Sequence, residues 1–172
     1  MDASDLRALQ APLKEQYKAD ANAAFVTLKA RGDLSGEGLA CKVSTSRALI
    51  EAGLHPATGG TGMQACSGDM LLEALVACAG VTLKAVATAL DFRLQGGAVR
   101  AEGDLDFRGT LGVAKDAPVG FAGIRLFFDL DTDEPQERID ALTKLTERYC
   151  VVFQTLAHPP EIKLAVNKGA AA

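Results

Sequence analysis

The sequence predicts an α+β fold with a mainly antiparallel sheet. The expected elements follow the order helix, two strands, buried helix, two strands, helix, strand, which is not the strict strand–helix alternation of a parallel sheet. Two long segments alternate polar and apolar residues, as strands do when one face of a sheet meets water. The chain has 172 residues, of which 48% are hydrophobic, and this suits one domain with a sizeable core.

The first expected element is a helix over residues 4–23. Its apolar residues fall at three- and four-residue steps, as on one face of a helix; they are Leu6, Leu9, Leu13 and Tyr17. Pro12 is expected to start a second helix, because proline favours the first helical position. We expect residues 1–23 to form an N-terminal extension and residues 24–172 to form the main domain.

Two strand-like runs come next, separated by the turn-rich stretch DLSGEG, and they predict a hairpin within residues 23–45. A glycine-rich loop, HPATGGTGMQACSGD, then leads into the central helix, expected over Met70–Leu90. Ser67 is a plausible N-cap for it, and Asp69 places negative charge in its first turn. Apolar residues run almost all the way round this helix, which predicts burial on most sides.

The remaining elements are two strands, a helix and a short strand. The strands are expected in AVRAEGDLDFRGTL and AGIRLFFDLDT, and the helix opens at Glu134–Glu137 and runs through IDALTKLTERYC. The sequence EIKLAV predicts a last strand after the HPP stop.

Charge and segment composition exclude several classes of function. The net charge is −4, and no basic patch is visible, so we expect no nucleic-acid partner, since phosphate binding needs clustered Lys and Arg. The apolar run after Met70 is interrupted by Glu73, Gly80 and Lys84, so we expect no membrane span. The N-terminus lacks the pattern of a signal peptide, which makes the cytoplasm, with its reduced thiols, the expected compartment.

The four cysteines are scattered at Cys41, Cys66, Cys78 and Cys150. None forms a CxxC pair, so their spacing does not favour a structural metal site. Two interpretations stay open for them: redox chemistry, or simple burial as small hydrophobic residues.

The GGTG loop, the following SGDMLLEALVACAGVTL and, some seventy residues later, ERYCVVFQTL together resemble the OsmC/Ohr family of osmotically inducible and organic hydroperoxide resistance proteins. The resemblance spans roughly residues 25–166. It implies an OsmC-like fold in which sheets wrap around the central helices of an intertwined homodimer, with active sites at the subunit interface and the N-terminal helix as an addition.

The same resemblance implies a thiol-dependent peroxidase that reduces organic hydroperoxides without metal, flavin or haem. By position, Cys78 would be the peroxidatic cysteine and Cys150 the resolving one, and a dithiol would restore the enzyme. Two departures stand out. Gly68, beside Asp69, occupies the place of a family glutamate, and Val151 stands where the family commonly has proline after the second cysteine.

A nucleophilic Cys78 has to be a thiolate, yet burial among aliphatic residues raises a thiol pKa. We therefore expect a nearby arginine, which stays charged when partly buried. The family uses an arginine held by an acidic side chain. Here we favour Arg47 over Arg31, although either is equally consistent with an exposed residue of a surface turn. Asp69 either holds that arginine or only caps the helix.

Leu75, Val81 and Phe153 would form an apolar mouth for alkyl peroxides or, as we favour, belong to the core. A rival hypothesis of another class is a non-catalytic protein of the same fold that binds a small apolar or electrophilic ligand.

Overall fold

A computed structural model describes residues 2–24, 27, 31–33, 40–44 and 49–167. Its helices and strands, in chain order, are α1 (Ala3–Ala19), the 3-10 helix η1 (Ala21–Ala24), β1 (Arg31–Asp33), β2 (Ala40–Ser44), β3 (Leu49–Gly53), the 3-10 helix η2 (Pro56–Thr58), β4 (Ala65–Cys66), α2 (Ser67–Ala89), β5 (Gly96–Leu105), α3 (Phe107–Thr110), β6 (Phe121–Asp131), α4 (Gln136–Tyr149) and α5 (Val151–Ala157).

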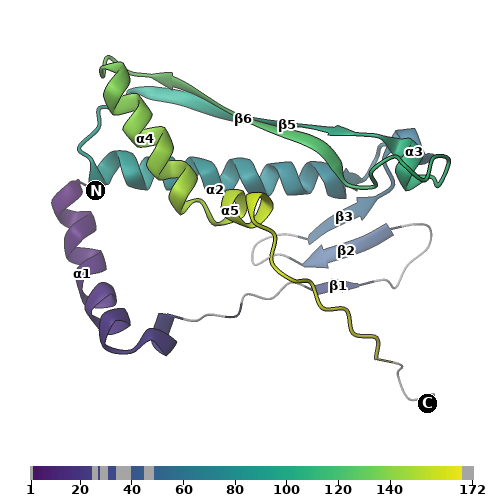
Figure 1. Cartoon of the computed structure of the whole chain (residues 1–172), viewed down its shortest axis with the longest axis horizontal. Coiled ribbons are helices and arrows are strands. Elements are labelled where there is room, and N and C mark those ends of the chain that lie inside the picture. The colour runs from purple at the N-terminus through teal and green to yellow at the C-terminus, as the bar shows by residue number, and fades with distance from the viewer. Residues whose placement is uncertain (1, 25–26, 28–30, 34–39, 45–48, 168–172) are drawn as a thin grey trace.

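The strands form two sheets. One has the order β1-β2-β3-β4, with antiparallel pairing except between β3 and β4, and the other is the long antiparallel pair β5-β6. Figure 1 shows α2 running beneath β5 and β6, with α4 and α5 beside it. The fold is therefore α+β and mainly antiparallel, as the order of elements predicts, and the β1-β2 pairing confirms the expected hairpin.

The core forms along one side of α2. Leu75, Ala79, Leu83 and Ala87 recur every four residues and are all buried, since side chains four apart share one helix face. The last two pack with Phe92 and with Leu142 of α4 in one cluster. The central helix is thus buried on one side, not on most sides as its composition predicts.

Within the described part of the chain, α2 is the one helix long and apolar enough to cross a membrane. Its most apolar 18-residue window has a mean hydropathy of 1.8, and 22% of that window is buried. Because β5, α4 and α5 all pack on α2, we take it as the central helix of a folded domain.

Four local predictions are wrong. α1 continues through Pro12 as one helix, held at its start by a capping box between Asp2 and Asp5. The N-cap of α2 is Cys66, not Ser67. The stretch 161–166 forms no strand in the single chain. Residues 49–53, for which no strand is expected, form β3 because they pair with β2 over their full length.

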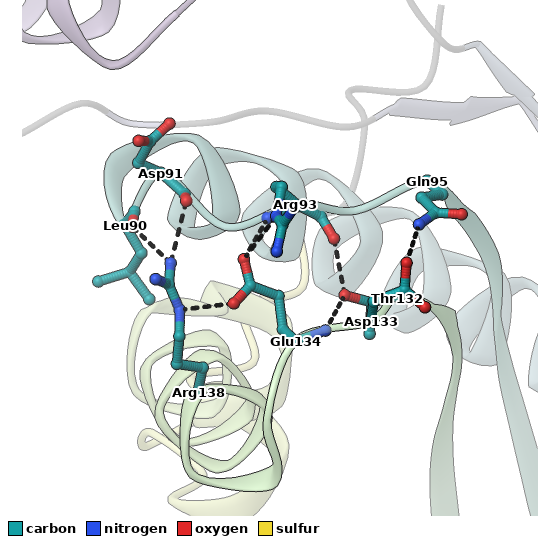
Figure 2. Close-up of polar contacts among 8 residues, drawn as sticks. All are labelled: Leu90, Asp91, Arg93, Gln95, Thr132, Asp133, Glu134 and Arg138. Atoms are coloured by element: carbon teal, nitrogen blue, oxygen red, sulfur yellow. Dashed lines mark hydrogen bonds and ion pairs between the residues drawn. The ribbon is translucent and has the colours of Figure 1, made fainter.

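A buried carboxylate joins the end of α2 to the start of α4 (Figure 2). Glu134, whose side chain is 5% exposed, accepts a hydrogen bond from the Arg93 backbone N–H at 3.0 Å and pairs with Arg138 at 3.1 Å. Arg138 also donates to the carbonyls of Leu90 and Asp91, the orphan acceptors at the end of α2. This cluster fixes α4 relative to α2.

Replacing Glu134 with alanine should lower the free energy of unfolding by about 2–3 kcal/mol, because a charged hydrogen bond and a buried pair are lost together. Urea denaturation measures this. Glu137→Ala is the matched control: Glu137 is an exposed acid in the first turn of α4, and its loss should change stability by at most about 0.5 kcal/mol. Equal effects of the two variants would contradict the structural role of Glu134.

Candidate active site

Cys78 and Cys150 come together although 71 residues separate them in the sequence. Cys78 lies midway along α2, half-buried, whereas Cys150 lies between α4 and α5 and is 1% exposed. Both thiols are free, and their side chains are hydrogen-bond neighbours. The structure thus brings together the two cysteines that the family resemblance pairs.

The junction of α4 and α5 positions Cys150. Its extended backbone ends α4 and begins α5 at the same residue. Its N–H donates to the Thr146 carbonyl at 2.9 Å, and its carbonyl accepts from the Gln154 N–H at 2.9 Å. The first N–H groups of a helix have no partner within that helix. The first turn of α5, which follows directly, therefore offers free donors at this place.

Those donors act on Cys78. Burial raises its pKa, but the backbone N–H groups of Val152 and Val151 and the side chains of Cys150 and Thr82 favour the thiolate. Their combined effect outweighs burial and holds the pKa of Cys78 below the ordinary value of a thiol. At neutral pH, Cys78 is therefore ionised to a larger extent than a free cysteine.

The pKa of Cys150 moves the other way. Burial raises it most, the N–H groups of Phe153 and Val152 lower it, and the neighbouring Cys78 raises it through the shared hydrogen bond and its charge. The balance holds the pKa of Cys150 above its ordinary value. Cys150 is therefore the protonated member of the pair, and its S–H is the donor that faces the Cys78 thiolate.

Among the described residues, no arginine belongs to the groups that lower this pKa. Arg47 lies outside the described residues, and so does the side chain of Arg31, the first residue of β1. Asp69 occupies the first turn of α2 and is exposed, nine residues before Cys78. The expectation of an arginine beside Cys78 therefore stays a prediction, and the N–H groups of α5 lower the pKa of the same thiol.

Sequence reasoning missed Val151, Val152 and Thr82. Thr82 follows Cys78 by four residues on the same helix, so the helical spacing could have predicted that the two side chains are neighbours. The two valines could not be identified in that way, because the expected helix stops at Cys150 and no separate α5 is predicted. Their contribution comes from the backbone, which leaves no signature in the residue type.

The apolar residues around the pair divide between core and surface. Leu75 is buried in the core, Val81 is exposed, and Phe153 is half-buried beside Cys150. His55 caps η2 by accepting a hydrogen bond from the Ala57 N–H at 3.0 Å, and its ring stacks on Phe107. Across the residues that the structure describes, no group of three or more His, Cys, Asp or Glu is arranged to hold a metal.

Two of three comparisons with known proteins find matches to this chain. A comparison with curated proteins finds no match. The OsmC-like protein of Mycoplasma pneumoniae superposes with a TM-score of 0.65 at 16% identity, covering 78% of this chain and 89% of its own. An organic hydroperoxide resistance protein OsmC from Legionella pneumophila gives 0.60 at 17% identity, covering 78% and 92%.

The organic hydroperoxide resistance protein OhrB of Bacillus subtilis gives a TM-score of 0.52 at 17% identity, covering 79% of this chain and 94% of its own. At these identities, the structures establish the fold alone. The model of the family described as OsmC-like protein matches residues 60–165, which is more than half of the chain and includes both Cys78 and Cys150. The chain therefore belongs to the OsmC-like protein family.

Proposed function

We propose that this protein is a thiol-dependent peroxidase that reduces organic hydroperoxides to alcohols in defence against oxidative stress. The observation that carries the proposal is a half-buried free thiol with a lowered pKa next to a buried free thiol with a raised pKa. Solved structures of the same fold that are named organic hydroperoxide resistance proteins support the substrate class.

In the proposed first step, the Cys78 thiolate attacks the outer oxygen of the hydroperoxide, and the O–O bond breaks. Cys78 becomes a sulfenic acid, and the alkoxide leaves and takes up a proton to form the alcohol. A low thiol pKa serves this step because the thiolate is the nucleophile. Arg47, with Asp69 as its acidic partner, is the group that we propose to stabilise the leaving alkoxide.

In the second step, the sulfur of Cys150 attacks the sulfenic sulfur of Cys78. An S–S bond forms, the S–OH bond breaks, and water leaves, which protects Cys78 from further oxidation. A dithiol then reduces the disulfide and becomes a disulfide itself. The cycle needs both cysteines reduced between turnovers, and this suits the reducing cytoplasm that we propose as its location.

We also propose that the protein works as a homodimer, because the single chain leaves a large apolar surface open. Val81 on α2 is 72% exposed, and a groove of about 510 Å³ runs beside it between α2 and β5, lined mostly by apolar residues. The tail residues Ile162, Leu164 and Val166 alternate along an extended segment and are 86–91% exposed. Exposed apolar surface of this kind is typical of protein interfaces.

The outer face of β5-β6 differs in character. Arg100 pairs with Asp129 at 2.7 Å, and Arg125 pairs with Glu102 and Asp104 across the strands. In these exposed ion pairs each charge already has a partner and contact with water, so burying them would bring no gain. We therefore propose that the second copy covers α2 and not this charged face.

The variant Val151→Pro should raise the pKa of Cys78, because proline has no backbone N–H and α5 then loses one of its donors. Val151 is the first helical residue of α5, and the extended Cys150 before it already has the backbone that proline favours, so the change should fit. We expect the pKa of Cys78 to rise, since one charge-assisted hydrogen bond to the thiolate is lost. The pH dependence of Cys78 alkylation by iodoacetamide measures it.

Val151→Ala keeps the N–H at the same position and is the matched control, with a pKa as in the wild type. At pH 7, the Val151→Pro variant should also consume hydroperoxide several-fold more slowly, because less of Cys78 is thiolate. A pKa unchanged by proline would contradict the role of the α5 backbone.

Cys78→Ser should abolish the consumption of cumene hydroperoxide, whereas Cys150→Ser should allow a single turnover followed by over-oxidation of Cys78 to the sulfinic acid. Mass spectrometry after one equivalent of peroxide detects the oxidation state of the cysteines in both variants. In the wild type, the mass should fall by two hydrogens, and the fragments should map this loss to a disulfide between Cys78 and Cys150. Cys66→Ser, which removes a free half-buried thiol outside the pair, should leave turnover intact. Unmodified wild-type thiols would favour the ligand-binding alternative.

Val81→Glu should convert the dimer to a monomer, because a charge would be buried on the apolar face of α2. Val113→Glu is the control, since Val113 is 73% exposed and lies in the link between α3 and β6. Sedimentation equilibrium reports the mass of each. A wild-type protein that sediments at the single-chain mass of 17.9 kDa would show the dimer proposal to be wrong.

A further inference from the structure

A small cavity opens beside Cys150 between α4 and β6. Its volume is about 170 Å³. Its lining includes Leu126, Phe128, Thr143, Glu147, Cys150 and Phe153. Cys78 is not among the described residues that line it. A molecule that enters this cavity therefore meets Cys150 and not the peroxidatic cysteine.

The dimensions of the cavity limit what can enter. A cavity of about 170 Å³ suits a short unbranched chain better than a bulky peptide thiol. Its walls are apolar apart from two threonines and Glu147. Thr143 and Thr146 use their hydroxyl protons on helix carbonyls of their own α4. Glu147 is an exposed carboxylate, so the charge at this cavity repels anions.

We propose that this cavity admits the reductant of the Cys78–Cys150 disulfide, a slender neutral or cationic thiol that attacks the sulfur of Cys150. The inference rests on the proposed function, because it needs the disulfide that the peroxidase cycle forms. Beyond that cycle, the attacked sulfur is that of Cys150, and the reductant reaches it from the side of the cavity.

The step balances as an exchange between thiol and disulfide. The thiolate of the reductant forms a new S–S bond with Cys150, the Cys78–Cys150 bond breaks, and Cys78 leaves with the electron pair as a thiolate. The second thiol of the reductant then attacks the reductant's own bound sulfur. Cys150 leaves and takes up a proton, and the reductant departs as a disulfide.

The acidity of the two thiols supports this direction. The leaving sulfur of such an exchange departs faster when its thiol pKa is lower. The pKa of Cys78 is lowered and that of Cys150 is raised. Attack on Cys150 therefore expels the better leaving group and returns Cys78 directly to its reactive form.

The site of attack can be mapped in a Cys41→Ser, Cys66→Ser background, which leaves only Cys78 and Cys150 of the four cysteines. Diamide forms the disulfide without peroxide, so the test does not depend on peroxidase activity. A brief pulse of cysteamine, acid quenching and N-ethylmaleimide then label the two sulfurs differently. Trypsin separates them, because Cys78 lies in peptide 48–84 and Cys150 in peptide 149–163.

We expect cysteamine on Cys150 and maleimide on Cys78 at the earliest times. The reverse labelling would overturn the inference and leave the proposed peroxidase unaffected. Failure of diamide to form the disulfide would instead count against the cysteine pair itself, and so against the proposed function as well.

A second experiment uses a variant, Thr143→Met, whose larger side chain fills the cavity. Reduction of the disulfide by dithiothreitol should become about tenfold slower, because the reductant can no longer reach Cys150 in a reactive position. A single oxidation of Cys78 by hydroperoxide should keep its rate. Thr88→Met is the control, because Thr88 is also a half-buried threonine bonded to the carbonyl four residues earlier, but on α2 away from the cavity. Wild-type reduction in Thr143→Met would overturn the inference.

A third experiment tests the charge of the cavity by comparing reduction by a cationic and an anionic thiol, and it needs no bulky substitution. Cysteamine should reduce the disulfide faster than 3-mercaptopropionate after correction for thiol pKa, and Glu147→Gln should shrink this preference. A preference that does not change in Glu147→Gln would contradict the assigned role of the carboxylate.

Discussion

The chemistry of this fold depends on one contact, between the sulfur of Cys78 and the first turn of α5. An apolar helix such as α2 suppresses ionisation of a thiol at its centre, because burial disfavours charge. The unpaired N–H groups of Val152 and Val151, together with the side chains of Cys150 and Thr82, oppose that effect at Cys78. Since Cys150 is the N-cap of α5, the same junction that favours ionisation of one cysteine also places the other beside it.

The contact requires α5 to be held rigidly, and a helix of seven residues has little stability of its own. Its position therefore comes from packing, through α4 and the buried side of α2. Leu142 and Thr146 of α4 are fully buried at four-residue spacing, and the Glu134 cluster fixes the far end of the same helix. The burial on one side of α2 leaves its other side apolar and open, and this is why the proposed dimer and the proposed active site arise from a single helix.

Most of the fold was predictable because periodicity reports burial. The hairpin, the central helix, both long strands and α4 all appear near their expected bounds, and the cysteine pairing followed from family resemblance. Three features were not predictable, each for a physical reason. The end of a helix at Cys150 hides the start of α5, because both share that residue. Backbone donors such as the N–H of Val152 do not depend on the side chain. The strand expected at 161–166 has the alternation of a strand, but pairing requires a neighbouring edge, and no local pattern specifies one.

Val151, which stands where the resembling family commonly has proline, affects the acidity of Cys78. Proline at the first position of a helix favours the helix start but has no N–H to donate. Valine keeps that N–H, and it is one of the groups that lower the pKa of Cys78. A chain with proline there would lack this donor and would depend more on a positively charged side chain to hold its thiolate. The valine of this chain shifts part of that task to the backbone. Backbone donors keep their strength at every pH. The N–H of Val152 also lowers the pKa of Cys150, but burial and the neighbouring Cys78 outweigh it, so Cys150 stays the protonated member of the pair.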